Sequence, residues 1–129
     1  MKKHLFLSSL LSLALAVPAL ASQPAVPDKP LEFKGSKKTV IFNHSTHTSV
    51  ECVVCHHNVD GKPNYQKCAT SGCHDDLTGR KGVKSLYAAV HTKKGLKQET
   101  CLSCHTKLAA EQPDKKKELT GCAKSKCHP

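Results

Sequence analysis

The amino-acid sequence predicts a small, mainly α-helical fold with few regular elements and a short N-terminal two-stranded β-hairpin. Residues 31–33 and 39–42 have strand character and flank Gly35-Ser36, as in a small hairpin. The clearest helical patterns, over 85–91 and 98–110, are both short. Large apolar residues are scarce, because the 129 residues include no Trp, two Tyr and three Phe. Such a chain buries little core by itself, so a non-protein group is expected inside it.

Turn and cap residues divide the rest of the chain into short pieces. Asn43 is a predicted N-cap, and glycine and proline mark most of the other boundaries. In chain order the predictions are a turn over 44–47, a turn over 60–64, a short helix leading into Cys68, a loop over 78–83, a helix end at Gly95, a helix break at 112–113 and a short charged helix over 114–119.

Residues 1–21 have the composition of a secretory signal peptide. Lys2 and Lys3 supply a positive start, residues 5–17 an apolar run, and residues 19–21 a small-x-small cleavage site. The apolar run is too short for a spanning helix. The sequence therefore predicts a mature chain over 22–129, about 108 residues in one domain, in the periplasm.

All eight cysteines fall into pairs, and each pair is followed directly by a histidine. Cys-x-x-Cys-His is the attachment signature of a c-type haem, in which two thiols bond to one porphyrin edge and the imidazole reaches the iron. Two of the pairs enclose two residues and two enclose four. The four motifs are Cys52 and Cys55 with His56, Cys68 and Cys73 with His74, Cys101 and Cys104 with His105, and Cys122 and Cys127 with His128.

The histidine count agrees with four c-type haems. Four attachment sites use all eight cysteines and four histidines, and four more histidines remain after residue 21: His44, His47, His57 and His91. This leaves one spare imidazole for each iron. His57 directly follows His56, and in a helix neighbouring residues point about 100° apart, so His57 is expected to ligate a second iron. Haems held by adjacent residues lie close enough for electron tunnelling.

Other uses of these residues fit less well. Four disulfides would give no reason for a histidine after every pair, and an exported zinc domain would not need so many further imidazoles. Each spare histidine or aromatic residue could also be ordinary surface or core. With haems present, Phe42, Tyr65 and Tyr87 are expected to pack on porphyrin faces, and the haem-free chain is expected to be unfolded or molten.

The mature chain is basic, with 18 Lys and Arg against 10 acidic residues. Nucleic-acid binding is disfavoured because aromatic residues for base stacking are lacking and the chain is exported. Haem propionates would neutralise much of the charge, which leaves a local lysine patch suited to an acidic partner. This patch surrounds the fourth attachment site: Lys115, Lys116, Lys117, Lys124 and Lys126, with Lys93, Lys94 and Lys97 shortly after His91.

The motif order CxxCH, CxxxxCH, CxxCH, CxxxxCH resembles the tetrahaem cytochrome c3 family (class III multihaem c-type cytochromes) of sulfate-reducing bacteria. The likeness includes Phe-Asn-His-Ser-Thr-His, Cys-His-His, Tyr-Gln-Lys-Cys-Ala-Thr and Leu-Thr-Gly-Cys. It implies a small haem-packed multihaem cytochrome fold, and electron transfer between periplasmic hydrogenase and membrane redox complexes of sulfate respiration. It also implies the ligand pairs His44 with His56, His57 with His74, His47 with His105, and His91 with His128.

Two imidazoles on every iron predict an electron carrier rather than an enzyme. A six-coordinate iron has no position for substrate, and bis-His ligation lacks the axial Met that raises haem potentials. The sequence thus predicts a periplasmic, low-potential electron-transfer protein with four haem irons. The alternative is a multihaem reductase with one open iron, which would require that one spare histidine is not a ligand.

Overall fold

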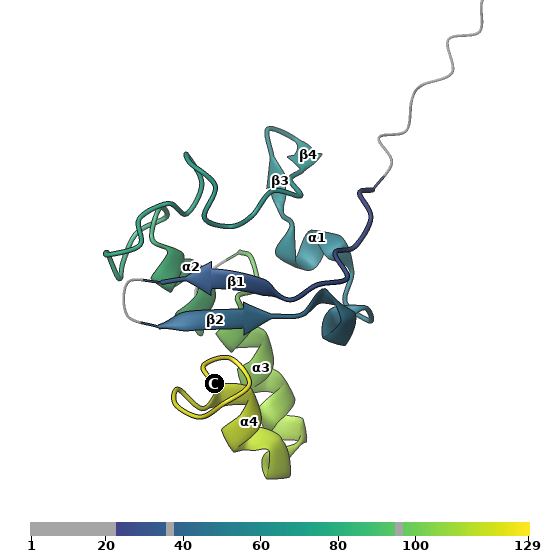
Figure 1. The fold of residues 1–129 in the computed structure, drawn as a ribbon, viewed down its shortest axis with the longest axis vertical. Coiled ribbons are helices and arrows are strands. Elements are labelled where there is room, and N and C mark those ends of the chain that lie inside the picture. The colour runs from purple at the N-terminus through teal and green to yellow at the C-terminus, as the bar shows by residue number, and fades with distance from the viewer. Residues whose placement is uncertain (1–22, 36–37, 95–96) are drawn as a thin grey trace, which may run out of the picture.

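The computed structural model of the chain describes residues 23–35, 38–94 and 97–129. The predicted signal peptide lies outside these ranges. Within them, none of the helices combines the length and the apolar composition needed to span a bilayer. The described residues form short helices and two small antiparallel sheets, joined by long irregular segments (Figure 1).

The predicted N-terminal hairpin is confirmed. Strands β1 (Leu31–Lys34) and β2 (Thr39–Phe42) pair antiparallel, with Leu31 opposite Phe42 and Lys34 opposite Thr39. Side chains of β1 alternate between half-buried and exposed, as expected for a strand with one covered face. Phe33 and Phe42 meet edge to face with ring centres 6.1 Å apart, which joins the two strands on the covered side.

Three short elements follow the hairpin. The 3-10 helix η1 (His44–His47) is followed by α1 (Cys52–Cys55) and by a second hairpin, β3 (Asn58–Val59) with β4 (Lys62–Pro63). The turn between β3 and β4 is formed by Asp60 and Gly61. Their φ values of 51° and 78° are the left-handed values of a tight two-residue hairpin turn. Asn43 precedes η1 as predicted, but its side chain makes no capping bond. Instead its carbonyl oxygen accepts from Thr46 and contacts His47.

Two predicted boundaries in the middle of the chain are wrong. The residues before Cys68 are irregular with a bend at Gln66 rather than a short helix, and the turn that follows has the Thr70 N–H donating to the Lys67 carbonyl oxygen. Helix α2 (Leu86–His91) ends at His91 and not at Gly95, which is outside the described residues. The predicted cap at Ser85 is confirmed, since its hydroxyl accepts from the Ala88 N–H.

The C-terminal third holds the longest helix. Helix α3 (Cys101–Glu111) begins with a capping box between Thr100 and Ser103 and ends just before Pro113, as predicted. A 3-10 turn η2 (Pro113–Lys115) and α4 (Lys116–Thr120) follow, so the predicted short charged helix is confirmed. Gly121 ends α4, and its N–H donates to the Lys117 carbonyl oxygen.

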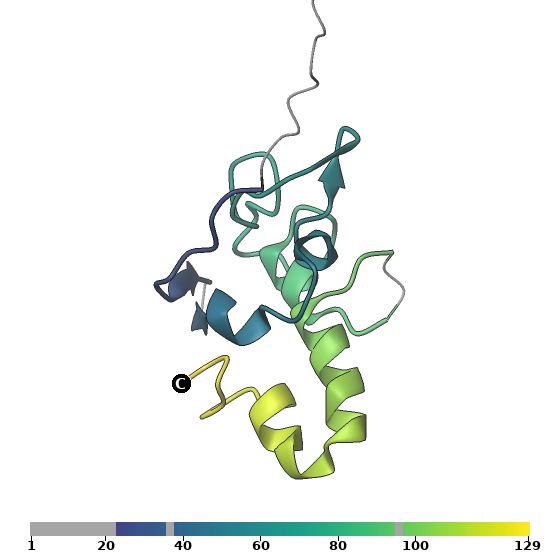
Figure 2. The same ribbon diagram turned by 90° about the vertical axis from the view of Figure 1, so that its right-hand side faces the viewer.

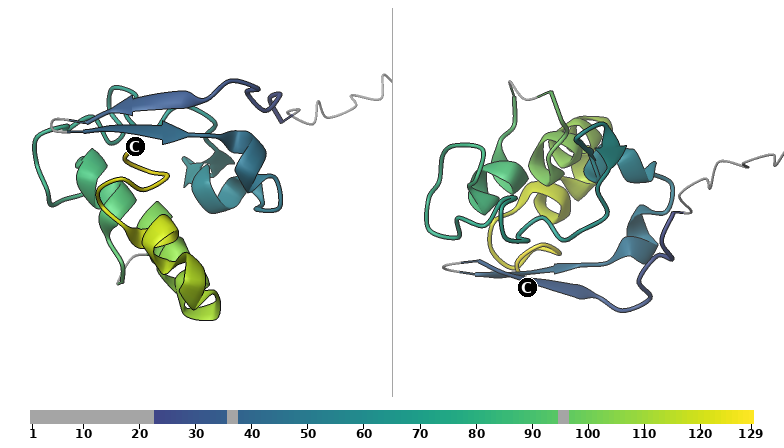
Figure 3. Two further views of the ribbon diagram at one scale, coloured as in Figure 1. Left: turned by 60° about the horizontal axis from the view of Figure 1, so that its bottom comes forward. Right: turned by 90° about the horizontal axis from the view of Figure 1, so that it is seen from above.

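The described residues form a very small protein core. The pair α3 and α4 projects away from the β1–β2 hairpin, and the C-terminal segment returns from α4 toward β2 (Figures 1 and 2). Seen from above, this segment lies between the hairpin and the helices (Figure 3). In the described residues, the buried apolar side chains are Leu86 and Ala109. Two such residues cannot stabilise a domain of this length, so the fold needs material that the chain does not supply.

Candidate haem sites

The first two Cys/His motifs close the backbone in the same way. In α1 the His56 N–H donates to the Cys52 carbonyl oxygen at 2.7 Å. In the longer second motif the His74 N–H donates to the Cys68 carbonyl oxygen at 2.9 Å, although the segment is not helical. Gly72 has φ of 87° and lets the extra residues loop out. Motifs of both lengths therefore bring the histidine back to the first cysteine.

The cysteines are free, and four of them, one from each motif, lie near one another. All eight thiols are unbonded, contrary to the disulfide interpretation. The Cys101 thiol is solvent-accessible, yet protein atoms crowd around it at longer range. This desolvation raises its pKa to about 11, and the nearby thiols of Cys55, Cys68 and Cys127 act in the same direction. Each of these three belongs to a different motif, so thiols from all four motifs lie near one another.

The second cysteines of the middle two motifs, Cys73 and Cys104, differ in their exposure. Cys73 is half-buried, and its thiol adds to the raised pKa of Cys68, the first cysteine of the same motif. Cys104 is exposed on α3, and its thiol adds to the raised pKa of Cys55 in the first motif, where burial is the main cause. Cys73 therefore lies near its motif partner, whereas Cys104 also lies near a cysteine of another motif.

Each motif histidine faces one of the four spare histidines. An imidazole nitrogen lies about 2.0 Å from a bound metal and about 1.1 Å from its ring centre, so two imidazoles on opposite sides of one metal have centres about 6.2 Å apart. All four pairs have this separation. The ring centres are 6.3 Å apart for His44 and His56, 6.1 Å for His57 and His74, 6.0 Å for His47 and His105, and 6.1 Å for His91 and His128. These are the pairs that the family resemblance implies.

Three of the pairs have nearly parallel rings and one is crossed. The interplanar angles are 4° for the His44 pair, 15° for the His47 pair and 4° for the His91 pair. The rings of His57 and His74 are inclined at 67°. His57 is not in a helix as expected, because α1 ends at Cys55 and His56 has ψ of 72°. That bend directs His56 to His44 and His57 to His74.

Backbone carbonyl oxygens orient seven of the eight rings through Nδ1. A ring whose Nδ1–H donates to a carbonyl keeps its Nε2 lone pair for a metal, and the bond makes that nitrogen more basic. Sequence reasoning missed these acceptors, since backbone oxygens leave no signal in the residue types. The Nδ1–oxygen contacts are His47–Asn43 at 2.9 Å, His56–Asn64 at 3.0 Å, His57–Asn58 at 3.4 Å, His74–Val83 at 2.6 Å, His91–Tyr87 at 3.0 Å, His105–Leu119 at 3.1 Å and His128–Thr39 at 3.2 Å.

His44 is the exception. Its Nδ1 is buried and has no hydrogen-bond partner in the described part of the chain. Burial lowers the pKa of His44, and the neighbouring His56 and His47 rings lower it further. Both effects favour the neutral form of the ring, which is the form in which imidazole binds a metal.

The three aromatic residues singled out in the sequence contact these histidines. Phe42 lies between His44 and His47, with ring centres 4.8 Å from each. Tyr65 is 5.4 Å from His56, and Tyr87 is stacked on His91 at 4.2 Å. Each aromatic residue thus limits how the imidazole beside it can rotate.

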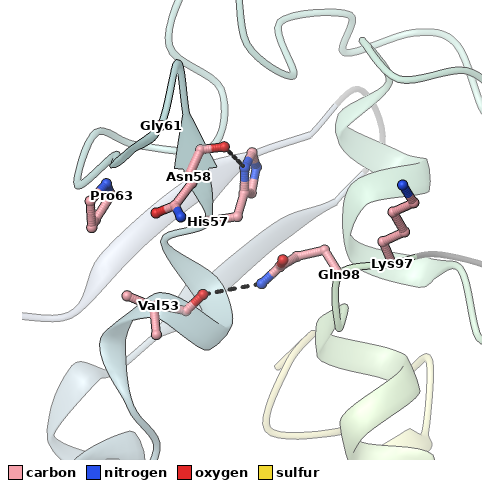
Figure 4. Close-up of a pocket in the computed structure, with 7 residues that line it drawn as sticks. All are labelled: Val53, His57, Asn58, Gly61, Pro63, Lys97 and Gln98. Carbon is pink, nitrogen blue, oxygen red and sulfur yellow. Dashed lines mark hydrogen bonds between the residues drawn. The ribbon is translucent and has the colours of Figure 1, made fainter.

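Hollows open beside the histidines and one attachment cysteine. One of about 650 Å³ adjoins the His57 ring, and Gln98 closes part of it by donating to the Val53 carbonyl oxygen at 3.2 Å (Figure 4). Another, of about 410 Å³, adjoins Cys52 and Tyr65. The first hollow is lined by Val53, His57, Asn58, Gly61, Pro63, Lys97 and Gln98. Paired imidazoles, nearby thiols and open space fit a flat group attached at its edge and ligated from both sides.

These two hollows do not reach most of the predicted attachment cysteines. Cys52 lines the smaller one, whereas Cys73 and Cys104 line neither. Cys104 is exposed on α3, and Cys73 is half-buried outside both of these hollows. Their role as thioether residues stays a prediction from the motif spacing.

The described residues contain no group of three or more His, Cys, Asp or Glu side chains that could hold a metal ion. The histidines are arranged in twos, unlike the tetrahedral Cys/His sets of structural zinc sites. The predicted lysine patch is fully exposed, from η2 through α4 to the C-terminus: Lys115, Lys116, Lys117, Lys124 and Lys126. Lys115 contacts Gln112 at 2.8 Å, and Lys126 lies 4.0 Å from Glu118.

The known proteins that this chain resembles are cytochromes c3. Residues 20–128 match the model of the class III cytochrome C family. The chain is 45% identical to a cytochrome c3 of Nitratidesulfovibrio vulgaris, over 99% of both chains. The solved structure of cytochrome c3 from Desulfovibrio desulfuricans is 65% identical and superposes with a TM-score of 0.80, covering 83% of this chain and all of that one.

A further solved structure, the di-tetraheme cytochrome c3 from Desulfovibrio gigas, is 30% identical with a TM-score of 0.57, over 81% of this chain and 97% of that one. The eight cysteines fit four c-type haems. The chain therefore belongs to the class III cytochrome c family and is a multihaem electron carrier rather than an enzyme.

Proposed function

We propose that each histidine pair ligates one haem iron, so that all four irons are six-coordinate and carry electrons at low potential. The observation that carries the proposal is the separation of 6.0–6.3 Å between ring centres in all four pairs. The proposed thioether pairs are Cys52 and Cys55, Cys68 and Cys73, Cys101 and Cys104, and Cys122 and Cys127. The histidines that follow these pairs, and that ligate the same haems, are His56, His74, His105 and His128. The histidines on the opposite side of each haem are, in the same order, His44, His57, His47 and His91.

The protein's part in this chemistry is to fix and tune the ligands. When bound, the haem irons supply one-electron chemistry by alternating between ferric and ferrous states. Carbonyl oxygens on Nδ1 make the imidazoles stronger donors, which favours the ferric state and lowers the potential. The absence of Met from the ligand set acts in the same direction. With a histidine of each pair on either side, a bound iron would have no open position for substrate or oxygen.

Neighbouring ligands connect the sites. His56 and His57 are consecutive but belong to different pairs, and His44 and His47 share η1 while facing His56 and His105. Alpha carbons of adjacent residues are about 3.8 Å apart, so groups ligated by such residues are near neighbours. We expect electrons to pass among these sites without motion of the backbone.

The test of ligation is an EPR and optical spectrum of the purified ferric holoprotein, together with its intact mass. We expect a mass with four covalent haems and only low-spin iron, because imidazole on both sides gives a strong axial field. A high-spin fraction in fully matured protein would show an open iron and contradict four histidine pairs. A mass without haem would contradict covalent attachment.

We further propose that residues 1–21 direct export and that the mature protein works in the periplasm. The charged start, apolar run and small-x-small site support this. Haem attachment to exported cytochromes takes place outside the cytoplasmic membrane, so export and maturation go together. Fractionation of the source cells and N-terminal sequencing test the proposal. We expect haem protein in the periplasmic fraction with a terminus near Ser22; protein that stays cytoplasmic would contradict it.

The proposed partners are periplasmic hydrogenase and other redox proteins that dock at the lysine patch. Lys124 and Lys126 lie within the fourth motif and are exposed, so an acidic surface placed there comes close to His128. Charged patches of this kind mainly accelerate encounter, and salt weakens them.

Charge reversal tests this docking. We expect Lys124→Glu with Lys126→Glu to slow reduction by hydrogenase about tenfold or more at low ionic strength, with the difference shrinking at high salt. The matched control is Lys62→Glu with Lys67→Glu, which makes the same charge change near β4 and the second motif. Equal slowing by both double variants would point to net charge and contradict a specific patch.

A further inference from the structure

Arg80 is linked to the His91 ligand through an aromatic stack. Its guanidinium carbon lies 4.3 Å from the centre of the Tyr87 ring. The same ring stacks on His91 at 4.2 Å with an interplanar angle of 18°, and the Tyr87 carbonyl oxygen contacts His91 Nδ1 at 3.0 Å. A cation, an aromatic ring and an axial imidazole are therefore in successive contact.

The loop before α2 holds Arg80 in this position. Asp76 Oδ1 lies 2.8 Å from the Gly79 N–H and 3.0 Å from the Thr78 N–H, so both amides donate to this carboxylate. The Ser85 hydroxyl is completely buried and donates to the Gly79 carbonyl oxygen at 2.7 Å. A side chain at residue 79 would meet the Asp76 carboxylate and displace it, so glycine allows this contact. These contacts fix the backbone directly before Arg80.

The positive charge of Arg80 is not neutralised by a partner in the described residues. The ion pairs found there join Lys107 to Glu99 and Lys126 to Glu118. Asp76, the acid nearest in the loop, already accepts bonds from Thr78 and Gly79. The guanidinium is left to interact with the face of Tyr87, where the ring quadrupole attracts a cation.

We propose that Arg80, acting through Tyr87, is a positioning and tuning residue for the redox site of His91 and His128. The inference rests on the proposed function, in which these two histidines ligate one iron. The held guanidinium places a positive charge on the His91 side of that iron. Reduction adds a negative charge at the iron, so a nearby cation favours the ferrous state and raises the potential of this haem.

The separations bound the size of the effect. The His91 and His128 rings are 6.1 Å apart. Taken end to end through the Tyr87 ring, the separations place the midpoint between these two rings no more than about 12 Å from the guanidinium. Across this distance, effective dielectric constants between those of water and of a protein surface give a change of about twofold to tenfold in the ferric–ferrous equilibrium constant. A tenfold change corresponds to about 59 mV for one electron.

The test is a redox titration of the holoprotein followed by proton NMR, in which the methyl resonances of each haem report its own oxidation state. We expect Arg80→Gln to lower the potential of the His91/His128 haem, which corresponds to a change of about twofold to tenfold in its ferric–ferrous equilibrium constant. The other three haems should be affected less. The shift should shrink at high salt, since the charge is exposed. The control Lys81→Gln removes the same charge from the next residue, and we expect a smaller shift.

A double-mutant cycle tests the role of Tyr87. In a Tyr87→Leu background the guanidinium loses its aromatic support, so Arg80→Gln should have less effect than in the wild type, whereas Tyr87→Phe should preserve the full effect. The inference is overturned if Arg80→Gln leaves this haem unchanged, if Lys81→Gln shifts it equally, or if the shift does not respond to salt. Each of these three outcomes leaves the iron low-spin, so it concerns Arg80 and not the ligation. High-spin iron in the wild-type protein would instead show that the ligation itself is wrong.

Discussion

The crossed rings of His57 and His74 distinguish one proposed haem site from the other three at the level of single residues. Axial imidazoles donate π density to iron in a direction set by their ring planes. Parallel rings separate the two iron orbitals that receive this density, whereas crossed rings leave them close in energy. Near-degenerate orbitals increase the anisotropy of a low-spin ferric EPR signal.

We therefore expect one highly anisotropic signal and three more rhombic ones in the ferric protein. The highly anisotropic signal belongs to the site with rings inclined at 67°, and the others to sites with angles of 4–15°. The measurement is low-temperature EPR of wild type and of His57→Met. If the variant loses one of the rhombic signals and keeps the anisotropic one, the crossed geometry is assigned to the wrong pair.

His57→Met also tests the ligand assignment through the potential. Methionine is a weaker donor than imidazole and favours ferrous iron, so we expect one potential to rise by on the order of a hundred millivolts, within the span of about 0.8 V that axial ligands produce. The intact mass should still show four haems, since His57 belongs to no Cys pair. Four unchanged potentials in a fully loaded variant would mean that His57 is not a ligand.

At the level of elements, Ser85 is the residue on which the placement of α2 depends. It is fully buried, caps the helix at Ala88 and donates to the Gly79 carbonyl oxygen. Ser85→Ala removes the cap and leaves that carbonyl without its donor. We expect the free energy of unfolding to fall by about 1–3 kcal/mol.

Denaturant unfolding of the holoprotein measures this loss. The control is Ser45→Ala in η1, where the serine is exposed and the same hydroxyl is removed without burial. We expect the control to match wild type within about 0.5 kcal/mol, as for most surface substitutions. Similar losses in both variants would show that the buried position of Ser85 has no special effect.

Helix α3 makes an acid-sensitive contact with Glu99, the residue just before its N-cap Thr100. Glu99 accepts hydrogen bonds from Lys107 and Ser103, and the Lys107 bond is the main cause that lowers the pKa of Glu99 below its usual 4.5. A carboxylate with a depressed pKa stabilises the folded state above its unfolded pKa. This contribution disappears as the pH falls from 4.5 through the lower folded value.

We accordingly expect Glu99→Gln to unfold at lower denaturant concentration than wild type at pH 7, and at about the same concentration near pH 3. The pair is exposed, so added salt should reduce the difference at pH 7. Glu111→Gln, at the other end of α3 and also exposed, serves as the control for loss of one acid. A pH-independent difference for Glu99→Gln would exclude the ionised contact as its cause.

At the level of the whole molecule, the sequence predicted best what depends on spacing. The hairpin followed from the two runs of strand character around Gly35-Ser36, α2 from the cap at Ser85, and the four motifs from the cysteine spacing. The predicted helix before Cys68 is wrong, because the Asn64 side chain accepts from the Gln66 N–H and this local bond competes with helix formation. The ring spacings and the contact of Arg80 with Tyr87 arise from tertiary packing, which residue types do not encode locally.

The small protein core leads to the last prediction, which concerns the haem-free chain. In the described residues Leu86 and Ala109 are the buried apolar side chains, and the longest helix has 11 residues. Isolated helices shorter than about 12–15 residues are marginal in water, and two-stranded hairpins are no more stable. Neither local structure nor protein packing can therefore offset the entropy lost on folding.

We expect residues 22–129, produced without haem attachment, to be unfolded or molten, whereas the matured protein unfolds cooperatively. Far-UV circular dichroism, near-UV circular dichroism and dye binding during thermal unfolding measure the difference. The matured protein has the same sequence and is the matched control. A sharp cooperative transition in the haem-free chain would show that the protein holds this fold by itself. Its paired histidines would then be positioned before any haem is attached, and attachment would follow folding instead of driving it.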